Sequence, residues 1–165
     1  MNGTVYWITG LSGAGKTTVG ELLYEKIHMK KDNVVLLDGD ELRKIFRCYD
    51  YSDEGRKKLA FKYSELCFFL SNQGIDVIIC TISMYDDVRK WNRENIRKYK
   101  EIYLKVPIEV LIKRNQKGLY RMESKENVVG LNSIFEEPKN PDIILVNDGT
   151  NSPKYIIKKI LDNNT

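Results

Sequence analysis

The segment GLSGAGKTT, residues 10–18, constrains the fold of this chain more than any other stretch. It places three glycines within six residues, and it follows directly on the apolar run VYWIT. Glycine at this density weakens strands and helices alike, because glycine loses more conformational freedom on folding than other residues do. The segment is therefore expected to serve a purpose that requires bare backbone.

Residues 10–17 fit the phosphate-binding P-loop pattern G-x-x-x-x-G-K-[ST], with an apolar strand before it and a helical stripe after it. The glycines allow backbone N–H groups to close around phosphate, and the helix N-terminus adds positive charge. Lys16 is predicted to reach the β- and γ-phosphates, and the Thr17 hydroxyl to ligate Mg²⁺. The predicted ATP site on this segment consists of Gly10, Leu11, Ser12, Gly13, Ala14, Gly15, Lys16, Thr17 and Thr18.

Five short apolar runs, rich in β-branched residues, alternate along the chain with segments of helical period. They cover residues 4–9, 33–38, 75–81, 101–106 and 142–147. Runs that are apolar on both faces are typical of strands in a parallel sheet. One helical stripe is predicted to run from Val88 through Trp91 and Asn95 to Tyr99. The alternation predicts an α/β fold, with a doubly wound five-stranded parallel sheet in a single domain over residues 1–165.

The charge balance, 27 Lys and Arg against 23 Asp and Glu, gives a formal net charge of +4. This mildly positive charge suits the binding of anionic small molecules, but it falls short of the strong positive charge that is typical of nucleic-acid-binding proteins. Three cysteines without CxxC spacing are interpreted as buried thiols in a reducing compartment, and a single histidine argues against a zinc site. No signal peptide or apolar span is recognised, so we expect a cytoplasmic protein without a membrane partner.

One long polar segment, residues 115–141, interrupts the alternation of strands and helices. A loop of this length in a compact domain is usually functional, and its aromatic and basic residues favour a lid over the active site.

Two acids flank a glycine in LLDGDELR, residues 36–43. Acids at the carboxyl end of a parallel strand face the ligand crevice. Asp40 could therefore accept the proton of an acceptor hydroxyl, and Asp38 could bind Mg²⁺. Alternatively, Asp40 caps a helix that starts at Glu41, and both roles can hold together. Arg43 follows one helical turn later, where a guanidinium could bind acceptor phosphate.

Four segments together resemble the adenylylsulfate kinase family: GLSGAGKTT, LDGD with Arg43, ISMY at 82–85 and KGLY at 117–120. The resemblance runs from about residue 4 to 146. It implies ATP- and Mg²⁺-dependent phosphorylation of a nucleotide ribose 3'-hydroxyl, with Asp40 as the base. It also implies that Arg114 and Lys117 contact ATP and that Ser83 is either a phosphoserine intermediate or, as we favour, a hydrogen-bond partner of the acceptor. The implied acceptor site consists of Asp38, Arg43, Tyr51, Arg56, Ile82, Ser83, Lys117, Gly118, Leu119 and Val128.

The chain departs from the family pattern on the acceptor side. Leu59 stands where the family has an asparagine, and Val128 stands where it has a phenylalanine that stacks on adenine. Loss of one aromatic face removes about 1–3 kcal/mol of stacking, which suits a smaller base. Relatives with this VVG lid resemble cytidine diphosphoramidate kinases of capsule biosynthesis, so the acceptor is predicted to be cytidine diphosphoramidate, with adenylylsulfate as the alternative.

Two other function classes were weighed. A GTPase would carry an N-K-x-D motif, and NDGT at 147–150 lacks the lysine. A non-catalytic nucleotide-binding module would have a damaged catalytic set, whereas Lys16, Thr17 and Asp40 are all present. The expected partner is a small nucleotide, with a homodimer also considered.

Overall fold

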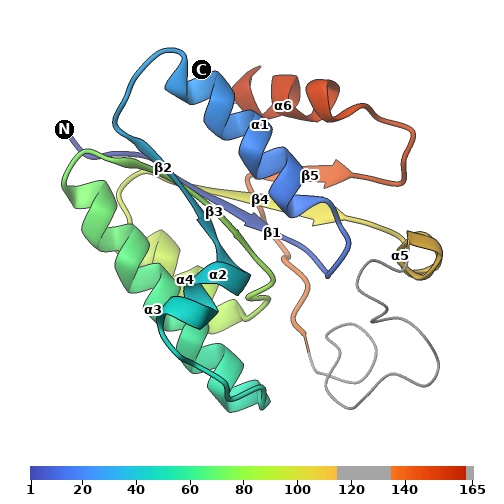
Figure 1. The fold of residues 1–165 in the computed structure, drawn as a ribbon, viewed down its shortest axis with the longest axis horizontal. Coiled ribbons are helices and arrows are strands. Elements are labelled where there is room, and N and C mark those ends of the chain that lie inside the picture. The colour runs from blue at the N-terminus through green and yellow to red at the C-terminus, as the bar shows by residue number, and fades with distance from the viewer. Residues whose placement is uncertain (115–134, 163–165) are drawn as a thin grey trace.

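A computed structural model describes residues 1–114 and 135–162, which form five strands and six helices (Figure 1). The strands are β1 (Val5–Thr9), β2 (Val34–Asp38), β3 (Asp76–Thr81), β4 (Tyr99–Lys105) and β5 (Ile143–Val146). The helices are α1 (Lys16–His28), α2 (Gly39–Ile45), α3 (Asp53–Asn72), α4 (Asp86–Asn95), α5 (Ile108–Arg114) and α6 (Pro153–Asp162).

All strand pairs are parallel, and the strand order is β2-β3-β1-β4-β5. β1 lies at the centre, where Val5 pairs with Val77 of β3 and with Tyr99 of β4. The predicted α/β fold with a five-stranded parallel sheet is confirmed. Because all strands run in the same direction, their carboxyl ends meet at one edge of the sheet.

Each face of the sheet is covered by its own helices and has its own core. Side chains alternate along β1, so Tyr6 and Ile8 join the cluster formed with α1 and α6, whereas Val5 and Trp7 join the cluster formed with α3 and α4. Figure 1 shows α1 and α6 on one side of the sheet and α3 with α4 on the other. All five residues of β1 are buried, which explains why the run VYWIT is apolar on both faces.

The predicted helical stripe from Val88 to Tyr99 was wrong at its end. α4 stops at Asn95, Ile96 has extended backbone (φ −90°, ψ 111°), and Tyr99 begins β4. Ile96 is 3% exposed, so its burial in the core draws the chain out of the helix. The Tyr99 ring then packs at 6.5 Å from Trp7, in the same core cluster.

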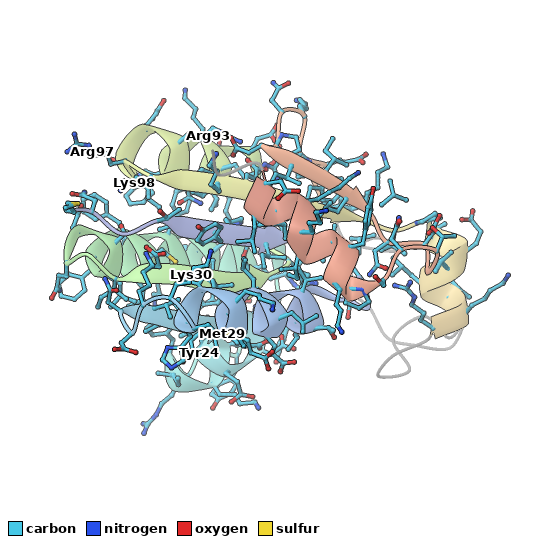
Figure 2. All side chains as sticks on the ribbon, turned by 90° about the horizontal axis from the view of Figure 1, so that it is seen from above. Tyr24, Met29, Lys30, Arg93, Arg97 and Lys98 are labelled. Carbon is cyan, nitrogen blue, oxygen red and sulfur yellow. The ribbon has the colours of Figure 1, made fainter. Side chains whose placement is uncertain are left out.

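Two further expectations concern the thiols and the membrane. All three cysteines are free, with Cys67 and Cys80 buried and Cys48 half-buried. None of the helices within residues 1–114 and 135–162 combines the length and hydropathy that crossing a membrane requires. Figure 2 shows Arg97 and Lys98, which precede β4, at the end of the molecule away from α5, so these cations lie far from the carboxyl edge of the sheet.

Candidate active site

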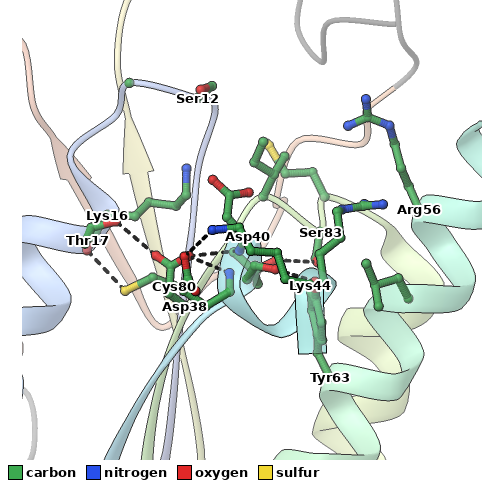
Figure 3. A pocket seen from close by; sticks show the side chains of 18 of the residues that line it. Ser12, Lys16, Thr17, Asp38, Asp40, Lys44, Arg56, Tyr63, Cys80 and Ser83 are labelled. Atoms are coloured by element: carbon green, nitrogen blue, oxygen red, sulfur yellow. Dashed lines mark hydrogen bonds and ion pairs between the residues drawn. The ribbon is translucent and has the colours of Figure 1, made fainter. Parts of the chain in front are cut away.

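An open cavity of about 1000 Å³ lies at the carboxyl edge of the sheet. Figure 3 shows Lys16 and Thr17 on one side of it, Asp38 and Asp40 in the middle, and Ser83 with Arg56 on the opposite side. The P-loop residues that line the cavity are Ser12, Gly13, Gly15, Lys16, Thr17 and Thr18. The sheet topology therefore brings the predicted ATP side and the predicted acceptor side into one space.

Glycine is required in the P-loop at two positions. Gly13 and Gly15 have φ angles of 79° and 90°, in the left-handed region that glycine adopts without a steric penalty. Gly15 is also the residue before α1, and a methyl group there would lie 2.8 Å from Nδ2 of Asn147. The loop therefore turns into α1 with its backbone bare, as phosphate binding requires.

Lys16 lies inside this loop. Its ammonium donates hydrogen bonds to the carbonyl oxygens of Gly10, at 2.9 Å, and Leu11, at 2.8 Å. The Lys16 side chain is half-buried and lines the cavity. Phosphate oxygens of a ligand could therefore replace these two carbonyls as hydrogen-bond acceptors of its ammonium group.

Two residues behind the P-loop hold it in place. Arg114 donates to the carbonyls of Gly13, at 3.3 Å, and Asn147, at 2.9 Å. The Asn147 amide donates in turn to the carbonyl of Ala14 at 2.8 Å. Arg114 was predicted to contact ATP, and the structure places it directly beside the phosphate loop. Asn147 was missed, although its position just after β5, at the carboxyl edge, was the signal that could have found it.

Asp38, and not Asp40, caps the helix that follows β2. Oδ1 of Asp38 accepts hydrogen bonds from the backbone N–H groups of Asp40, at 2.9 Å, and Glu41, at 3.3 Å. The alternative role for Asp40 as the cap was therefore wrong, because α2 begins at Gly39 rather than at Glu41. Asp40 is exposed and lines the cavity, where its carboxylate can accept a proton.

Asp38 also reaches across to the P-loop. Its second oxygen, Oδ2, accepts a hydrogen bond from the Thr17 hydroxyl at 3.2 Å. A hydroxyl and a carboxylate at this separation are hard oxygen ligands of the kind that Mg²⁺ prefers. In the described part of the chain no three His, Cys, Asp or Glu side chains gather into a metal cage. Mg²⁺ characteristically binds through one or two protein oxygens together with substrate phosphates and waters.

The ring of Tyr51, a residue of the predicted acceptor site, is in contact with two other residues of that site, Arg43 and Arg56. The guanidinium of Arg43 lies 4.6 Å from the centroid of the Tyr51 ring, and that of Arg56 lies 5.6 Å from it. Arg43 also donates to the carbonyls of Cys48 and Asp50, and Arg56 to that of Tyr51. The three predicted residues are thus brought together at one end of the cavity.

Ser83 has an unusual backbone conformation at the cavity wall. Its φ is 28°, in the left-handed region, and its hydroxyl lies 2.7 Å from Oγ1 of Thr81. The carbonyl of the neighbouring Ile82 accepts a hydrogen bond from the Thr9 hydroxyl. Strained conformations of this kind persist only where the surroundings fix them, and they cluster at functional sites.

The cavity also includes residues that sequence reasoning missed or treated only as a departure. Leu59 is 1% exposed and offers only carbon atoms to the acceptor end. Tyr63 is buried, its hydroxyl donates to the carbonyl of Gly39 at 2.6 Å, and burial raises the pKa of its phenol. Burial likewise raises the pKa of the Cys80 thiol to about 12, against a smaller opposing effect of Lys16. Both groups are therefore neutral near pH 7. Phe135, Met84, Tyr85 and Tyr49 were also missed.

Part of the predicted site lies outside the described residues. This holds for Lys117, Gly118, Leu119 and Val128, and for residues 115–134 of the predicted lid. Residues 135–141, the end of that segment, are described.

Comparison with known proteins identifies close relatives. The sequence model named "Adenylylsulphate kinase" matches residues 2–146. The chain is 42% identical to the cytidine diphosphoramidate kinase of Campylobacter jejuni, over 96% of this chain and 97% of that protein. It is 38% identical to the probable adenylyl-sulfate kinase of Archaeoglobus fulgidus, over 87% of this chain and 96% of that protein. The solved structure of Mycobacterium tuberculosis APS kinase CysC in complex with AMPPNP and APS matches with a TM-score of 0.89 at 28% identity, covering 98% of this chain and 97% of that one.

Proposed function

The chain belongs to the adenylylsulfate kinase family, and from that premise we propose that it transfers the γ-phosphoryl group of ATP to the ribose 3'-hydroxyl of cytidine diphosphoramidate. Family membership makes it an ATP-dependent phosphotransferase rather than a GTPase or a non-catalytic module. The observation that carries the choice of acceptor is the 42% identity to a cytidine diphosphoramidate kinase over nearly the full length of both chains.

The P-loop is proposed to hold the phosphates of ATP. Its backbone N–H groups and the N-terminus of α1 attract the negative charge, and the Lys16 ammonium moves from the loop carbonyls to the β- and γ-phosphate oxygens. Arg114 and Asn147 keep the loop in shape, because both bond to its carbonyl oxygens. The site is therefore largely formed before ATP arrives.

Thr17 and Asp38 are the residues that would hold Mg²⁺, as their oxygens already lie 3.2 Å apart. When bound, the ion neutralises charge on the β- and γ-phosphates. Oδ1 of Asp38 accepts two hydrogen bonds from backbone N–H groups in the first turn of α2, which fixes the carboxylate with Oδ2 directed at Thr17.

Phosphoryl transfer requires a base near the acceptor hydroxyl. Asp40 is proposed to accept that proton while the hydroxyl oxygen forms a bond to the γ-phosphorus and the bond to the β–γ bridging oxygen breaks, which releases ADP. Arg43 and Arg56 are proposed to hold the diphosphate of the acceptor, since among the described residues they supply the guanidinium groups that line this end of the cavity. The Ser83 hydroxyl would hydrogen-bond the acceptor.

Adenylylsulfate remains the second candidate acceptor, favoured by the identity of 38% to an adenylyl-sulfate kinase. Leu59 argues against it, because a buried leucine cannot replace the hydrogen bond of the asparagine that the family pattern has there. The deciding measurement is the ratio of kcat/KM for the two acceptors at saturating ATP and Mg²⁺. We expect cytidine diphosphoramidate to be preferred, with Lys16→Ala as the inactive control. A strong preference for adenylylsulfate would assign the ordinary family function to this chain.

Other features of the function stay predictions. We propose that the enzyme acts in capsule biosynthesis in the cytoplasm, as a homodimer, and without binding nucleic acid. The mild formal charge of +4 supports only the last of these.

A further inference from the structure

We propose that Phe135 forms an aromatic wall against the base of the acceptor nucleotide and so helps to select the acceptor. This inference rests on the proposed function, because it requires a nucleotide acceptor in the cavity. Phe135 is half-buried, and it lines the same cavity as Tyr51 and Arg56. Among the described lining residues it is the one that comes from beyond α4, so it reaches the site from a separate part of the chain.

The position of Phe135 is fixed by its neighbour. The backbone N–H of Glu136 donates to the carbonyl of Met84 at 2.9 Å, and the Glu136 carboxylate accepts from the backbone N–H of Asp86 at 2.7 Å. The carbonyl of Glu136 accepts from the guanidinium of Arg89 at 2.8 Å, and Arg89 is only 5% exposed. These three hydrogen bonds of Glu136 hold the segment that contains Phe135 against the loop that carries Ser83.

The chemistry around Phe135 suits a base rather than a phosphate. Met84 and Tyr85 line the cavity directly after Ser83, which gives this wall carbon-rich and aromatic surface. The guanidinium groups of Arg43 and Arg56 lie instead over the ring of Tyr51. If a nucleotide binds its diphosphate to Arg43 and Arg56, its base still requires an apolar surface to pack on. The ring of Phe135 provides such a surface, and the base can reach it without displacing an arginine.

Because two arginines contact the Tyr51 ring, the ring of Phe135 adds a stacking surface for the base. A base that stacked on Tyr51 alone would have to share that ring with two guanidinium groups at 4.6 Å and 5.6 Å. With Phe135 the base gains an aromatic contact of its own, and base–aromatic stacking is tolerant of base identity because every base has a π-face. Selectivity then comes from how large a base fits between this ring and the rest of the cavity.

The test compares acceptors with and without a base. Phe135→Ala should lower kcat/KM for the nucleotide acceptor roughly 5- to 150-fold, the range expected for one base–aromatic stack. The same variant should leave kcat/KM for ribose 5-diphosphate, which has no base, within about threefold of wild type, because the coupling is confined to the base. Phe135→Tyr keeps the ring and should restore the nucleotide value. Phe69→Ala, at a phenylalanine that is 60% exposed on α3, is the matched control.

The possible outcomes separate the inference from the proposed function. A wild-type enzyme that phosphorylates no nucleotide overturns the proposed function. A wild-type enzyme that is active, with a Phe135→Ala variant that loses nothing or loses equally on both acceptors, overturns the role of Phe135 alone. An unchanged KM for ATP in Phe135→Ala, together with loss on the nucleotide only, supports it, since a merely misfolded cavity would weaken both substrates.

Discussion

Two carboxylates separated by one glycine have different surroundings in this molecule. Asp38 is half-buried and occupied on both oxygens, by the first turn of α2 and by Thr17. Asp40 is exposed to the cavity. At the scale of the residue, Asp38 therefore caps a helix as well as facing Thr17, whereas Asp40 is not the cap, and substitution can separate the capping role from that of the proposed base.

Substitution of the two acids should differ in its effect on stability. Asp40→Asn is expected to lower turnover by about 10²- to 10⁴-fold, the typical contribution of a general base. Asp38→Ala should lower the free energy of unfolding by about 0.5–2 kcal/mol, and by more than Asp40→Ala does, since only Asp38 caps the helix. Steady-state kinetics and urea unfolding measure both. Full activity of Asp40→Asn, with equal stability losses in the two alanine variants, would place the base elsewhere.

At the scale of the element, the conformation of the P-loop depends on contacts with residues far away in the sequence. Asn147, which lies 133 positions beyond Ala14 in the chain, bonds to that residue's carbonyl, and it occupies the space into which a side chain on Gly15 would project. The conformation of the loop is thus fixed jointly by its glycines and by the end of β5.

Gly15→Ala should weaken both the fold and the binding of ATP. The new methyl group would meet Asn147 at 2.8 Å, at a φ of 90° that L-residues rarely adopt. Gly149→Ala is the matched control, because φ is 98° there but the nearest atom to the new methyl group is 3.8 Å away. We expect both variants to lose about 1–2 kcal/mol of stability from backbone strain. Only Gly15→Ala should also lose roughly tenfold or more in affinity for an ATP analogue, or about 1.4 kcal/mol. If titration calorimetry gave Gly15→Ala and Gly149→Ala equal affinities for the ATP analogue, the contact with Asn147 would be dispensable for ATP binding.

Local pattern was sufficient to find all five strands, and insufficient for some of their ends. β4 starts at Tyr99, two residues before the predicted run at 101, because Tyr99 also fitted the helical stripe from Val88 and Lys100 is not apolar. Glu101 is 2% exposed, and Arg93 of α4 pairs with it at 2.9 Å. A residue-by-residue pattern cannot anticipate a counterion from another element. The same limit applies to Phe135, whose place at the cavity depends on hydrogen bonds of Glu136 to the loop after β3.

At the scale of the whole molecule, Arg89 joins three parts of the described chain. Its guanidinium bonds to Asp86 of α4 and to the carbonyl of Glu136, and its Nε lies 3.6 Å from Oε1 of Glu101 in β4. The side chain is 6% exposed, so it is almost completely removed from water, although its Nη1 has no hydrogen-bond partner among the described residues. Breaking a buried pair by removing one partner leaves an uncompensated charge, which commonly costs about 3–5 kcal/mol.

Arg89→Gln should therefore destabilise the fold by about 3–5 kcal/mol near neutral pH. The matched control is Arg97→Gln, at an exposed arginine on the far end of the molecule (Figure 2), where a change within about 0.5 kcal/mol is expected. Urea unfolding measures both variants.

The loss of folding stability in Arg89→Gln should depend on pH. Burial raises the pKa of Glu101 above its ordinary value, while Arg93 and Arg89 oppose that shift. A group whose folded pKa is raised contributes stability below its unfolded pKa, about 4.3 for glutamate, and loses it as pH rises through the folded value. Removal of Arg89 takes away one opposing charge and raises the pKa of Glu101 further. The stability gap between wild type and Arg89→Gln should then widen from about pH 4 toward neutrality. A gap that stays constant over this range would mean that Arg89 stabilises the fold through its hydrogen bonds to Asp86 and Glu136 and not as the counterion of Glu101.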